Sequence, residues 1–522
     1  MSSQAHPRDA VEDGDQSAVI AFLLQPQNYP QADIVKPIGT HAAIVFLAGD
    51  RAYKLKRAVK LPYLDFSTLE KRRAVIEREL EINSRATPEL YLSVLPVTRA
   101  PGEDRLELGG AGEPVDWLLA MRRFDQDALL HKMACDGRFT RGLAADLAVT
   151  VEHFHRHAPV VNDAGFADCL QRVADTLETA LCGPVAQARG VQVFAYIERL
   201  RQELAGKRAL IGEREREGFV RHCHGDLHLK NIVLWEGRPR LFDAIEFDDR
   251  LATIDVLYDL AFLLMDLLRR GLKDEANVIF NHYLKLGSIR EIEGLALLPL
   301  FLSFRAAIRA MTGIHALAVC GQAECESLAP EIASYASFAA GLLDVRRPRL
   351  VAIGGLSGVG KSSIARDAAA SIGAPPGALH LRTDVERKIM HGVSLTYRLS
   401  PEAYTPESRE EVYRRVFKKA EVALDAGVSV IVDAVFPVAT HRTQIRDIAL
   451  RMNAGFHGLW PEANEQVLRQ RIEARGADAS DADASVIEKQ LKTVEPPDAW
   501  TRIDASGEKK ATMAAIASAL ND

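Results

Sequence analysis

An eight-residue stretch from Gly355 to Ser362, which reads Gly-Leu-Ser-Gly-Val-Gly-Lys-Ser, constrains the fold of this chain more than any other feature. It follows a short apolar run, residues 350–353, and precedes a segment with helical character, residues 362–370. Glycines in such a loop let backbone N–H groups point at a phosphate, and the N-terminus of the following helix favours negative charge. The pattern predicts a strand, a phosphate-binding loop and a helix within a parallel α/β domain.

Positions within this loop have distinct expected roles in binding ATP and Mg²⁺. Lys361 is expected to reach the β- and γ-phosphates, and the Ser362 hydroxyl is expected to coordinate Mg²⁺. The remaining loop residues that we expect to surround the nucleotide are Gly355, Ser357, Gly358, Val359, Gly360 and Ser363. Chance matches to the pattern occur in other chains, but the flanking strand and helix favour nucleotide binding here.

Two carboxylates further along the chain favour a small kinase over a motor protein or a GTPase. Asp384 follows a predicted strand and is expected to accept a proton from the acceptor hydroxyl, while Arg387 holds the acceptor. The apolar run at 428–432 has the character of a buried parallel strand and ends at Asp433, which is suited to organise the magnesium shell. The sequence contains no N-K-x-D guanine signal.

Three arginines, Arg469, Arg471 and Arg475, lie on one predicted helix that ends at Gly476, as in a lid that closes on ATP. An ordinary solvated helix is the alternative interpretation. With these features, residues 349–522 resemble the small P-loop kinases of the gluconate-kinase, polynucleotide-kinase and zeta-toxin type. The resemblance implies that Arg471 and Arg475 contact the nucleotide.

A second signature, of unrelated type, lies earlier in the chain. It reads His224-Gly-Asp-Leu-His-Leu-Lys-Asn231 and is followed by Phe242-Asp243. Phosphoryl transfer needs a base at the acceptor hydroxyl, metal ions at the phosphates and a cation on the nucleotide. Asp226 is placed to be the base, and Asn231 and Asp243 are the expected Mg²⁺ ligands.

This string resembles the catalytic loop of the aminoglycoside phosphotransferase family, which reads H-G-D-x-x-x-x-N where protein kinases usually show H-R-D. The resemblance covers roughly residues 17–344 and includes Tyr258-Asp-Leu-Ala261. It implies a protein-kinase-like fold, which is a two-lobed α+β domain with a small β-rich lobe ahead of a larger helical lobe. The sequence patterns agree, because strand-like segments dominate before Asp125 and helical segments dominate beyond it.

The same resemblance implies which residues grip the nucleotide in the small lobe. Lys54 is the implied phosphate-binding lysine, and Lys56 is a near alternative because strand alternation puts it on the same face. Glu79, on the helix predicted over residues 68–85, is the implied partner of that lysine, although Glu77 could serve. Residues 117–123 would form the hinge beneath adenine. The sequence shows no clear G-x-G-x-x-G lid over the phosphates.

Two further patterns have alternatives that the sequence leaves open. His153, His155 and His157 suggest a metal site, but a solvent-facing helix is favoured because no acidic or cysteine partner is identifiable. Arg305 and Arg309 share a helical face and could hold an anionic acceptor group. A surface role in salt bridges is favoured for both arginines.

Composition limits the class of protein. The chain has 522 residues, of which 48% are hydrophobic and 26% charged, as in soluble proteins with more than one structural unit. The net charge of -6 argues against a chain that coats nucleic acid. The 6 cysteines include no C-x-x-C pair, which disfavours a zinc site and fits a reducing cytoplasm. No uncharged apolar run approaches the roughly 18 residues that span a bilayer.

The combined prediction is a chain with two catalytic domains. Residues 1–16 are expected to form a disordered tail, residues 17–344 the aminoglycoside-phosphotransferase-like domain, and residues 345–522 the P-loop domain. The predicted function is an ATP- and Mg²⁺-dependent phosphotransferase for small hydroxyl-bearing metabolites, such as sugars, amino sugars or aminoglycoside-like compounds. The alternatives are a regulatory protein with one catalytic domain and a polynucleotide 5′-hydroxyl kinase in the P-loop half.

We expect a cytoplasmic protein with small-molecule acceptors and no membrane partner. Nucleic acid is not favoured, because no basic-aromatic stretch is evident.

Overall fold

The computed structural model describes residues 14–30, 32–40, 42–61, 64–100, 105–188, 193–317, 322–474 and 479–521. The chain divides into two compact units that alternate along the sequence. The first comprises Met1–Phe139, His153–Phe166 and Glu215–Asp259, and the second comprises Thr140–Glu152, Ala167–Arg214 and Leu260–Asp522.

The domain boundaries predicted from the sequence, at residues 16 and 344, stay predictions. The expected disordered tail falls largely on residues 1–13, which lie outside the described residues. At the end of that segment, the Gln16 side chain donates hydrogen bonds to the Lys56 carbonyl (2.9 Å) and to Asp116 Oδ2 (2.7 Å). A strand begins at Arg349, close to the predicted start of the second domain.

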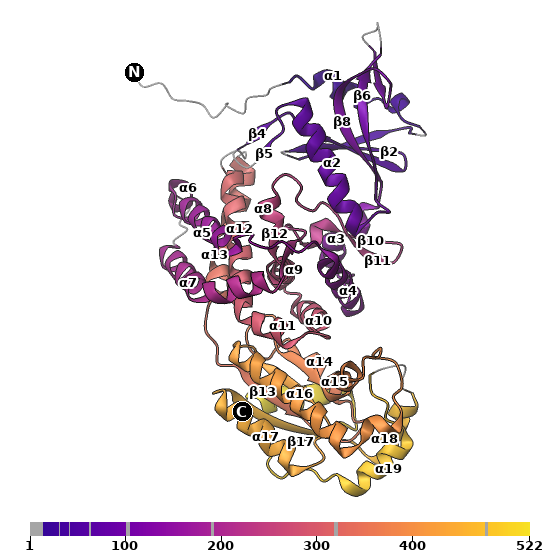
Figure 1. Ribbon diagram of the computed structural model, residues 1–522, viewed down its shortest axis with the longest axis vertical. Helices are drawn as coiled ribbons and strands as arrows, with labels where there is room; N and C mark the ends of the chain where they lie inside the picture. The colour runs from indigo at the N-terminus through magenta and orange to yellow at the C-terminus, as the bar shows by residue number, and fades with distance from the viewer. Residues whose placement is uncertain are drawn as a thin grey trace. The chain divides into compact units, whose positions relative to one another are not determined.

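The first unit begins with a six-stranded antiparallel sheet in the order β1-β2-β3-β8-β6-β7 (Figure 1). β2 and β3 form a hairpin and pair antiparallel across Gly49 and Asp50. Gly49 has a φ of 58°, which glycine adopts without steric cost. The strands are β1 (Val35–Gly39), β2 (Ala43–Ala48), β3 (Arg51–Lys56), β6 (Tyr91–Arg99), β7 (Leu106–Leu108) and β8 (Glu113–Arg122).

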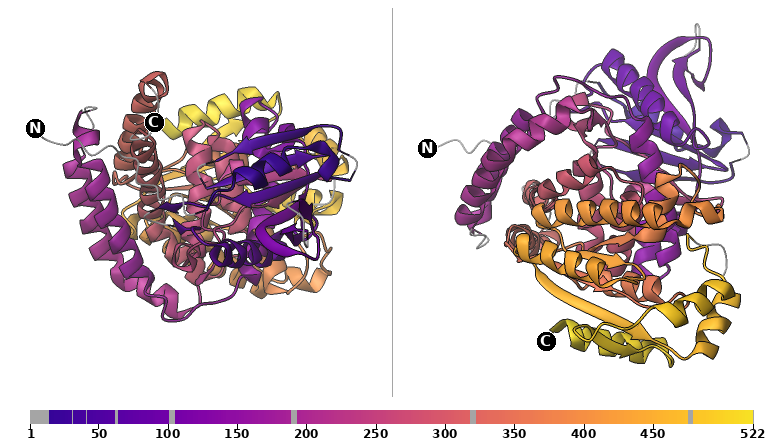
Figure 2. Two further views of the ribbon diagram at one scale, coloured as in Figure 1. Left: turned by 90° about the horizontal axis from the view of Figure 1, so that it is seen from above. Right: turned by 60° about the horizontal axis from the view of Figure 1, so that its bottom comes forward.

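A long helix, α2 (Leu69–Ala86), lies across one face of this sheet and contacts β8 and β6 (Figures 1 and 2). The Thr68 side chain caps its N-terminus by accepting a hydrogen bond from the Lys71 N–H. A second helix, α1 (Ser17–Leu23), packs its apolar side chains into a separate buried cluster with side chains of the sheet strands. The sequence predicted α2 within one residue at each end, but α1, β1 and β7 were not predicted.

Two short two-stranded antiparallel sheets follow in the second half of the first unit. β9 (Val220–His222) pairs with β12 (Thr253–Asp255), and β10 (Ile232–Trp235) pairs with β11 (Arg238–Leu241). The loop that holds Asp226 joins β9 to β10. An antiparallel sheet with one long helix, followed by a mostly helical region in which two short two-stranded sheets flank the Asp226 loop, is the protein-kinase-like order that the sequence predicted. The short helical elements of this unit are η1 (Pro26–Asn28), η2 (Gln126–Ala128), α3 (Leu130–Cys135), η3 (Leu229–Asn231) and α8 (Asp249–Ala252).

The second unit contains a helical part and an α/β part. In the helical part, α12 packs along α13, and ion pairs join α5 to α7. The helices are α5 (Phe166–Leu181), α6 (Pro184–Ala188), α7 (Phe194–Arg216), α10 (Lys273–Tyr283), α11 (Ile289–Glu293), η4 (Gly294–Leu297), α12 (Leu298–Leu317) and α13 (Gln322–Leu342). Two more helices, α4 (Arg141–His157) and α9 (Val256–Arg269), have residues in both units.

One helical stretch of the described chain, Ile289–Leu317, is long and apolar enough to cross a membrane by length and composition alone. Of its most apolar window, 72% is buried inside the fold, where it contributes the core of the helical part. A mostly buried core helix passes the same test of length and hydropathy, so this stretch is weak evidence for a membrane span.

The α/β part holds a five-stranded parallel sheet in the order β14-β15-β13-β16-β17, as the sequence predicted for the P-loop half. The strands are β13 (Arg349–Ile353), β14 (Leu379–Arg382), β15 (Val430–Asp433), β16 (Gly455–Glu462) and β17 (Thr501–Asp504). The helices are α14 (Lys361–Ala369), α15 (Thr383–Met390), α16 (Pro406–Asp425), α17 (Ala439–Arg451), α18 (Glu465–Glu473), α19 (Ala484–Thr493) and α20 (Lys509–Asn521), with η5 (Pro401–Tyr404) between α15 and α16.

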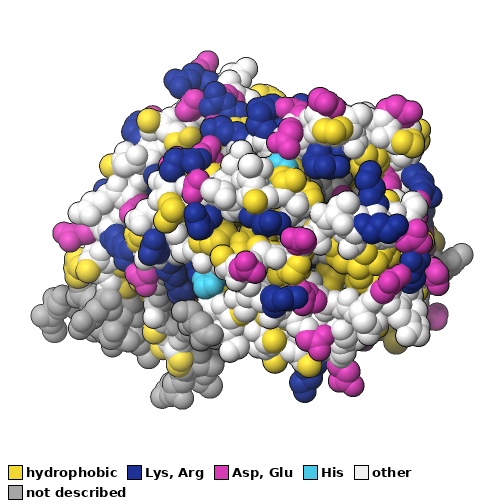
Figure 3. Space-filling model, turned by 90° about the horizontal axis from the view of Figure 1, so that it is seen from below, with side chains coloured by type: hydrophobic (Ala, Val, Ile, Leu, Met, Phe, Trp, Pro, Cys, Tyr) yellow, Lys and Arg dark blue, Asp and Glu magenta, His cyan; other side chains and the backbone are white. Residues whose placement is uncertain are grey.

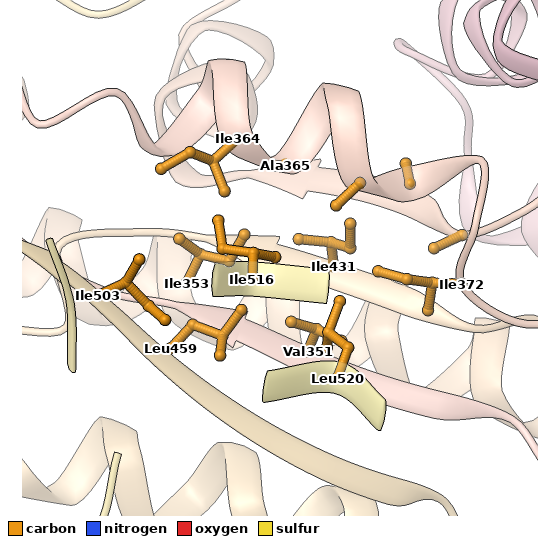
Figure 4. Close-up of a cluster of buried hydrophobic side chains, with 13 residues drawn as sticks. Val351, Ile353, Ile364, Ala365, Ile372, Ile431, Leu459, Ile503, Ile516 and Leu520 are labelled. Atoms are coloured by element: carbon orange, nitrogen blue, oxygen red, sulfur yellow. The ribbon is translucent and has the colours of Figure 1, made fainter. Parts of the chain in front are cut away.

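A buried apolar cluster fixes this sheet against two helices on one of its faces (Figure 4). Val351, Ile353 and Ile431 point from β13 and β15 toward Ile364 of α14 and Ile516 of α20. The central strands β13 and β15 are apolar throughout, which is typical of parallel strands covered on both faces. The cluster holds the start of α14, and with it the phosphate-binding loop, against the carboxyl end of β13.

Candidate active sites

In the first unit, three residues far apart in sequence form a connected set of ion pairs. Lys54 on β3 lies with its Nζ atom 2.6 Å from Glu79 Oε1 and 2.6 Å from Asp243 Oδ1. Glu79 is fully buried on α2, and Asp243 follows β11 with a φ of 61°. The Tyr91 hydroxyl accepts a hydrogen bond from the Asp243 N–H (2.9 Å), which helps to hold this unusual backbone conformation.

The neighbouring alternatives from the sequence have distinct positions. Lys56 is on the same face of β3 as Lys54, as predicted, and its Nζ atom lies 2.6 Å from Glu79 Oε2 and 2.5 Å from Glu246 Oε1. Glu77 points away and pairs with Arg73 at the surface. Both lysines therefore reach Glu79, but of the two only Lys54 has an ion pair with Asp243.

Electrostatics favour the charged forms of Lys54, which is largely buried, and of Asp243, which is half-buried. Burial alone would lower the pKa of Lys54, but the carboxylates of Asp243, Glu79 and Glu246 raise it well above its usual value. Burial would raise the pKa of Asp243, yet the opposing charge of Lys54 holds it below its usual value. For Glu246, burial prevails over the attraction of Lys56 and raises the pKa. Asp243 is thus an anion near neutral pH, as a Mg²⁺ ligand must be.

The predicted base and the first predicted Mg²⁺ ligand lie together on the loop after β9. The Asn231 side chain donates hydrogen bonds to the Asp226 carbonyl (3.0 Å) and to Asp226 Oδ2 (2.9 Å). The His228 ring nitrogen lies 3.4 Å from the same carboxylate oxygen. Asp226 also raises the pKa of Asp243 slightly through charge repulsion, so the two carboxylates belong to one site.

The backbone of this loop is anchored by Asp259, which sits at the start of α9. Its two carboxylate oxygens accept hydrogen bonds from the N–H groups of His224 and Gly225, each at 3.0 Å. Gly225 has a φ of 81°, a conformation that requires glycine at this turn. The sequence resemblance included Asp259 only as part of a motif, and its anchoring role was not predicted.

The histidine cluster on α4 does not behave as one surface patch. His153 and His157 are exposed, as expected, but His155 is buried and lies 3.1 Å from Asp259 Oδ2. With Cys223 these two residues form a buried group of potential metal ligands within 4.8 Å of one another. Because Asp259 already bonds the backbone of the loop that holds Asp226, the group has a structural explanation. The solvent-facing interpretation was wrong for His155, since a step of two residues turns its side chain about 200° around the helix, away from the exposed face of His153 and His157.

The surface role expected for Arg305 was also wrong. Arg305 is 5% exposed on α12, and its guanidinium lies over the ring of Phe262, 4.8 Å from the ring centroid. Delocalised charge lets arginine stack on an aromatic face inside a protein. Arg309, one turn further along α12, is partly exposed.

In the second unit, the phosphate-binding loop has the conformation that its glycines predicted. Gly355, Gly358 and Gly360 have φ values of 119°, 87° and 100°, a region that other residues rarely adopt. α14 begins at Lys361, directly after the loop. The Lys361 ammonium group donates to the carbonyls of Gly355 (3.0 Å) and Leu356 (2.9 Å) and so curls over the loop. Ser357, Val359 and Ser363 lie on the same loop and first helical turn.

The predicted Mg²⁺ residues of this loop are in contact. The Ser362 hydroxyl donates a 2.5 Å hydrogen bond to Asp433 Oδ2 at the carboxyl end of β15. His380 Nε2 and Arg382 Nε, both from β14, lie 3.4 Å and 3.6 Å from the same oxygen. Burial would raise the pKa of Asp433, but His380, Arg382 and Lys361 hold it far below its usual value. Asp433 is therefore an anion, paired with the hydroxyl expected to bind Mg²⁺.

The predicted acceptor residues lie on α15, which starts at the carboxyl end of β14. Burial raises the pKa of Asp384, and the charges of Arg382, Asp433 and Lys361 act on the same carboxylate. These charge interactions place Asp384 near the loop and Asp433. Arg387 donates to the Ala403 carbonyl (2.8 Å) and to Ser408 Oγ (3.2 Å), and it lies over the Tyr404 ring at 4.7 Å.

The three predicted lid arginines have different positions. Arg471 donates to the carbonyls of Val359 (3.1 Å) and Ala505 (2.8 Å), and thus braces the phosphate-binding loop from α18. Arg469 is paired with Glu465 and Glu488 near the surface, which agrees with the solvated-helix alternative for that residue. Arg475 lies outside the described residues.

Several residues that support this site were not predicted. The Gln490 side chain accepts a hydrogen bond from the Ser357 N–H (2.8 Å), and the rings of Trp460 and Trp500 lie beside Gly354. The carboxylate of Asp481 binds Lys388 (2.6 Å), a fully buried lysine on α15. These contacts join distant segments, and no local pattern in the sequence marks them.

Comparisons with known proteins match both most of the chain and its C-terminal part. A family model described as an AAA domain matches residues 350–497, a range that includes the phosphate-binding loop, Asp384 and Asp433. An uncharacterized protein of Mycobacterium tuberculosis is 29% identical over 487 residues, which cover 91% of this chain and 93% of that protein. An adenylyl-sulfate kinase of Myxococcus xanthus is 31% identical over 118 residues, or 22% of this chain and 59% of that enzyme.

Two solved structures are similar in fold to the first part of the chain. A choline/ethanolamine kinase family protein from Mesorhizobium loti gives a TM-score of 0.40 at 14% identity, covering 63% of this chain and 98% of that chain. The GDP complex of an aminoglycoside 2′-phosphotransferase gives a TM-score of 0.37 at 13% identity, covering 63% and 100%. The fold assignment itself rests on the strand order and helix positions described above. The strand order and helix positions thus give a region with the protein-kinase-like fold, followed by a P-loop domain in the range that the AAA-domain family model matches, residues 350–497.

Proposed function

We propose that this protein is an ATP- and Mg²⁺-dependent phosphotransferase with two nucleotide sites, one in each unit. The observation that carries the proposal is that each unit unites a phosphate-binding lysine with a buried or half-buried carboxylate suited to Mg²⁺. In the first unit these are Lys54 and Asp243, and in the second they are Lys361 and Asp433. Mg²⁺ bound at such carboxylates would neutralise charge on the transferred phosphoryl group.

In the first site, each residue has a role that its contacts support. Glu79 positions Lys54, so that the ammonium group is held where the phosphates of ATP would lie. Asp243 and Asn231 would hold Mg²⁺, with Asn231 releasing one of its hydrogen bonds to Asp226. Asp226, fixed by Asn231 and by the anchored loop, would take the proton of the acceptor hydroxyl as its oxygen attacks the γ-phosphorus.

In the second site, the loop from Gly355 to Lys361 would wrap the phosphates with its backbone N–H groups. Lys361 would leave the carbonyls of Gly355 and Leu356 and reach the β- and γ-phosphates. Ser362 and Asp433 would hold Mg²⁺ between them. Asp384, whose pKa is raised by burial, is suited to accept a proton from the acceptor, and Arg387 would hold an anionic part of that acceptor.

Small hydroxyl-bearing molecules are the acceptors that we propose for both sites, in a cytoplasmic protein. The similarity of the P-loop region to an adenylyl-sulfate kinase supports a small-molecule acceptor there. A polynucleotide acceptor would favour a continuous basic track. On the face shown in Figure 3, the basic and acidic side chains of the described residues are instead interspersed.

Calorimetric titration with a non-hydrolysable ATP analogue and Mg²⁺ tests the number of sites. The parent chain should bind two nucleotides and Lys361→Ala should bind one, because a charged contact to phosphate typically contributes about 1.5–3 kcal/mol. A stoichiometry of one in a well-folded parent chain would contradict the proposal.

Screening ATP consumption against sugars, nucleosides and aminoglycosides then tests the acceptor class. Activity that depends on Asp226 belongs to the first site, and activity that depends on Asp384 belongs to the second. ATP consumption that no acceptor in the panel stimulates, and that neither substitution changes, would favour a nucleotide-driven switch.

A further inference from the structure

A cavity of about 260 Å³ lies along β14, the edge strand of the parallel sheet, and adjoins the second candidate active site through His380 and Arg382, which lie near Asp433. Its walls come from the segment that contains α10 and α11 and from α14, α15 and α16. All of these residues belong to the second unit. Neither the phosphate-binding loop nor Asp384, Arg387 or Asp433 lines the cavity.

The side chains that build this wall are specific. The Asn281 amide, on α10, accepts a hydrogen bond from the His380 N–H (2.7 Å) and donates one to the Ala378 carbonyl (3.1 Å). The buried Asn277 donates to the carbonyls of Pro376 (3.0 Å) and Ala378 (3.2 Å). These hydrogen bonds join α10 to the N–H of His380 in β14 and to the carbonyls of the segment just before that strand.

Positive charge dominates the lining. Lys285, Arg366, Arg382 and Lys419 line the cavity, and Glu386 is the single acidic residue among its lining side chains. Glu386 is already paired with Lys419 at 2.7 Å. This excess contrasts with the net charge of -6 for the whole chain.

Several acids near the cavity have partners outside its lining, and the Asp146 carboxylate acts on His282 against the effect of the cations. Asp367, next to Arg366 on α14, pairs with Arg141 and with Lys509. Asp274, at the start of α10, pairs with Arg141 at 2.6 Å. Asp433 draws Arg382 to 3.6 Å but also bonds Ser362. Among the side chains that the structure describes, Arg366 has no ion-pair partner.

The positive charge also affects the pKa of His282, which lines the cavity. Burial lowers its pKa, and the charges of Lys285 and Arg366 lower it further, to about 4. The histidine is therefore neutral at physiological pH and can donate a hydrogen bond without adding charge. His380, also on the cavity wall, has a pKa lowered by burial in the same way.

We propose that this cavity is a binding site for a small, multiply charged anion of the phosphate-monoester class. Arginine and lysine together suit phosphate oxygens, and the neutral histidine can supply a further hydrogen bond. Pockets for drug-sized ligands run from roughly 300 to 1,000 Å³, so the cavity suits a ligand smaller than a nucleotide. The ligand would lie beside β14, which leads directly into Asp384, and this places it where it can influence the P-loop site.

The test uses the full chain with both nucleotide sites filled by a non-hydrolysable ATP analogue and Mg²⁺, since the phosphate-binding loop would otherwise also bind phosphate. Titration calorimetry then measures binding of glycerol 3-phosphate and of inorganic phosphate, with glycerol as the uncharged control. The parent should bind the two anions and not glycerol. Arg366→Gln should weaken binding, and the double substitution Lys285→Gln/Arg366→Gln should weaken it at least tenfold.

The matched control is Lys273→Gln, which removes an exposed lysine from the same helix, α10, without touching the cavity. It should bind both anions like the parent. Retained analogue binding and an unchanged melting temperature identify correctly folded variants. Failure of the parent to bind either anion, or equal binding by the parent and the folded double variant, would overturn the proposal.

Discussion

The two candidate active sites differ in how the chain assembles them. The first gathers Lys54, Glu79 and Asp243 from a strand, a helix and a distant loop, and joins them by ion pairs in a largely buried setting. The second takes Lys361 and Ser362 from one continuous loop and adds Asp433 from the neighbouring strand. The first site should therefore depend on the packing of its whole unit, whereas the second should depend on the conformation of one loop.

Charge follows the same division. In the first site a fully buried glutamate pairs with two lysines, so the loss of Glu79 removes one of the two carboxylate partners of each lysine. In the second site, a hydroxyl, a histidine and an arginine surround Asp433, so its stabilisation does not depend on a single neighbour. Substitutions in the first site should therefore mainly lower the stability of the protein. Substitutions in the second site should mainly change the local geometry of the loop.

Glu79→Ala should produce the largest effect. Removing one partner of a buried ion pair typically costs about 3–5 kcal/mol, because the remaining charge stays buried. We expect the free energy of unfolding of the first unit to fall by about this amount, as measured by chemical denaturation. Nucleotide binding that depends on Lys361 should persist.

Glu77→Ala is the matched control for that substitution. Glu77 lies on the same helix but pairs with Arg73 at the surface, with exposed fractions of 50% and 54%. Exposed ion pairs contribute about 0–1 kcal/mol, so this variant should unfold almost like the parent. Equal destabilisation by the two variants would contradict the buried-network account of the first site.

Asp226→Asn should have the next largest effect, and it should act on rate and not on stability. Loss of a general base typically reduces the rate by about a hundredfold or more. We expect this loss in kcat for an acceptor that uses the first site, with little change in ATP affinity or melting temperature. Activity of the second site should be unchanged.

Asp136→Asn provides the control for Asp226→Asn, because both side chains are 38% exposed. Asp136 follows α3 and pairs with Lys132 and Arg138 at the surface. It should retain the parental kcat. Near-normal turnover by Asp226→Asn would show that Asp226 is not the general base. The first site would then be supported only as a nucleotide-binding site.

Gly354→Ala should damage the second site alone. A Cβ atom at this position would lie 2.6 Å from two ring carbons of Trp460 and 2.8 Å from one of Trp500. Overpacking of this kind typically costs about 1–3 kcal/mol. Because Gly354 directly precedes the phosphate-binding loop, the variant should lose stability and bind nucleotide more weakly at that loop. The first site should keep its affinity.

Gly507→Ala is the matched control, since a Cβ atom there has no neighbour within 4 Å. It should be as stable as the parent. If Gly354→Ala binds nucleotide with parental affinity at both sites, the tryptophan rings do not set the position of the loop.

The sequence predicted the elements of the second site more completely than those of the first. The strand, loop and helix around Lys361 are contiguous, so local periodicity and glycine chemistry were sufficient to place them. The motif around Asp226 marked the first site, but it could not choose between Lys54 and Lys56, because strand alternation puts both on one face. In the structure both lysines form an ion pair with Glu79, and of the two only Lys54 also forms one with Asp243.

What the sequence did not predict depends on long-range contacts. Asp259 anchors the loop of the first site, and Arg471 and Gln490 brace that of the second, each from a separate helix. His155 was expected at the surface, because a histidine has no apolar signature that would mark it as buried. The cavity beside β14 depends on α10, which lies before the P-loop region in the chain, so no pattern within either motif could indicate it.

The smallest predicted effect concerns pH and the charge around that cavity. The pKa of His282 is about 4 in the folded protein, against an ordinary value of 6.5. Between these values the unfolded chain takes up a proton that the folded chain does not, so the free energy of unfolding falls as the pH falls from 6.5 toward 4. Lys285→Gln removes one cause of the lowered pKa, while burial and Arg366 remain. We expect the folded pKa of His282 to rise partway, and the variant to lose less stability than the parent over this window. Denaturation at several pH values measures the difference directly, and histidine-labelled NMR measures the pKa. Parallel loss of stability in parent and variant, with an unmoved His282 titration, would show that the cation at Lys285 does not act on the cavity.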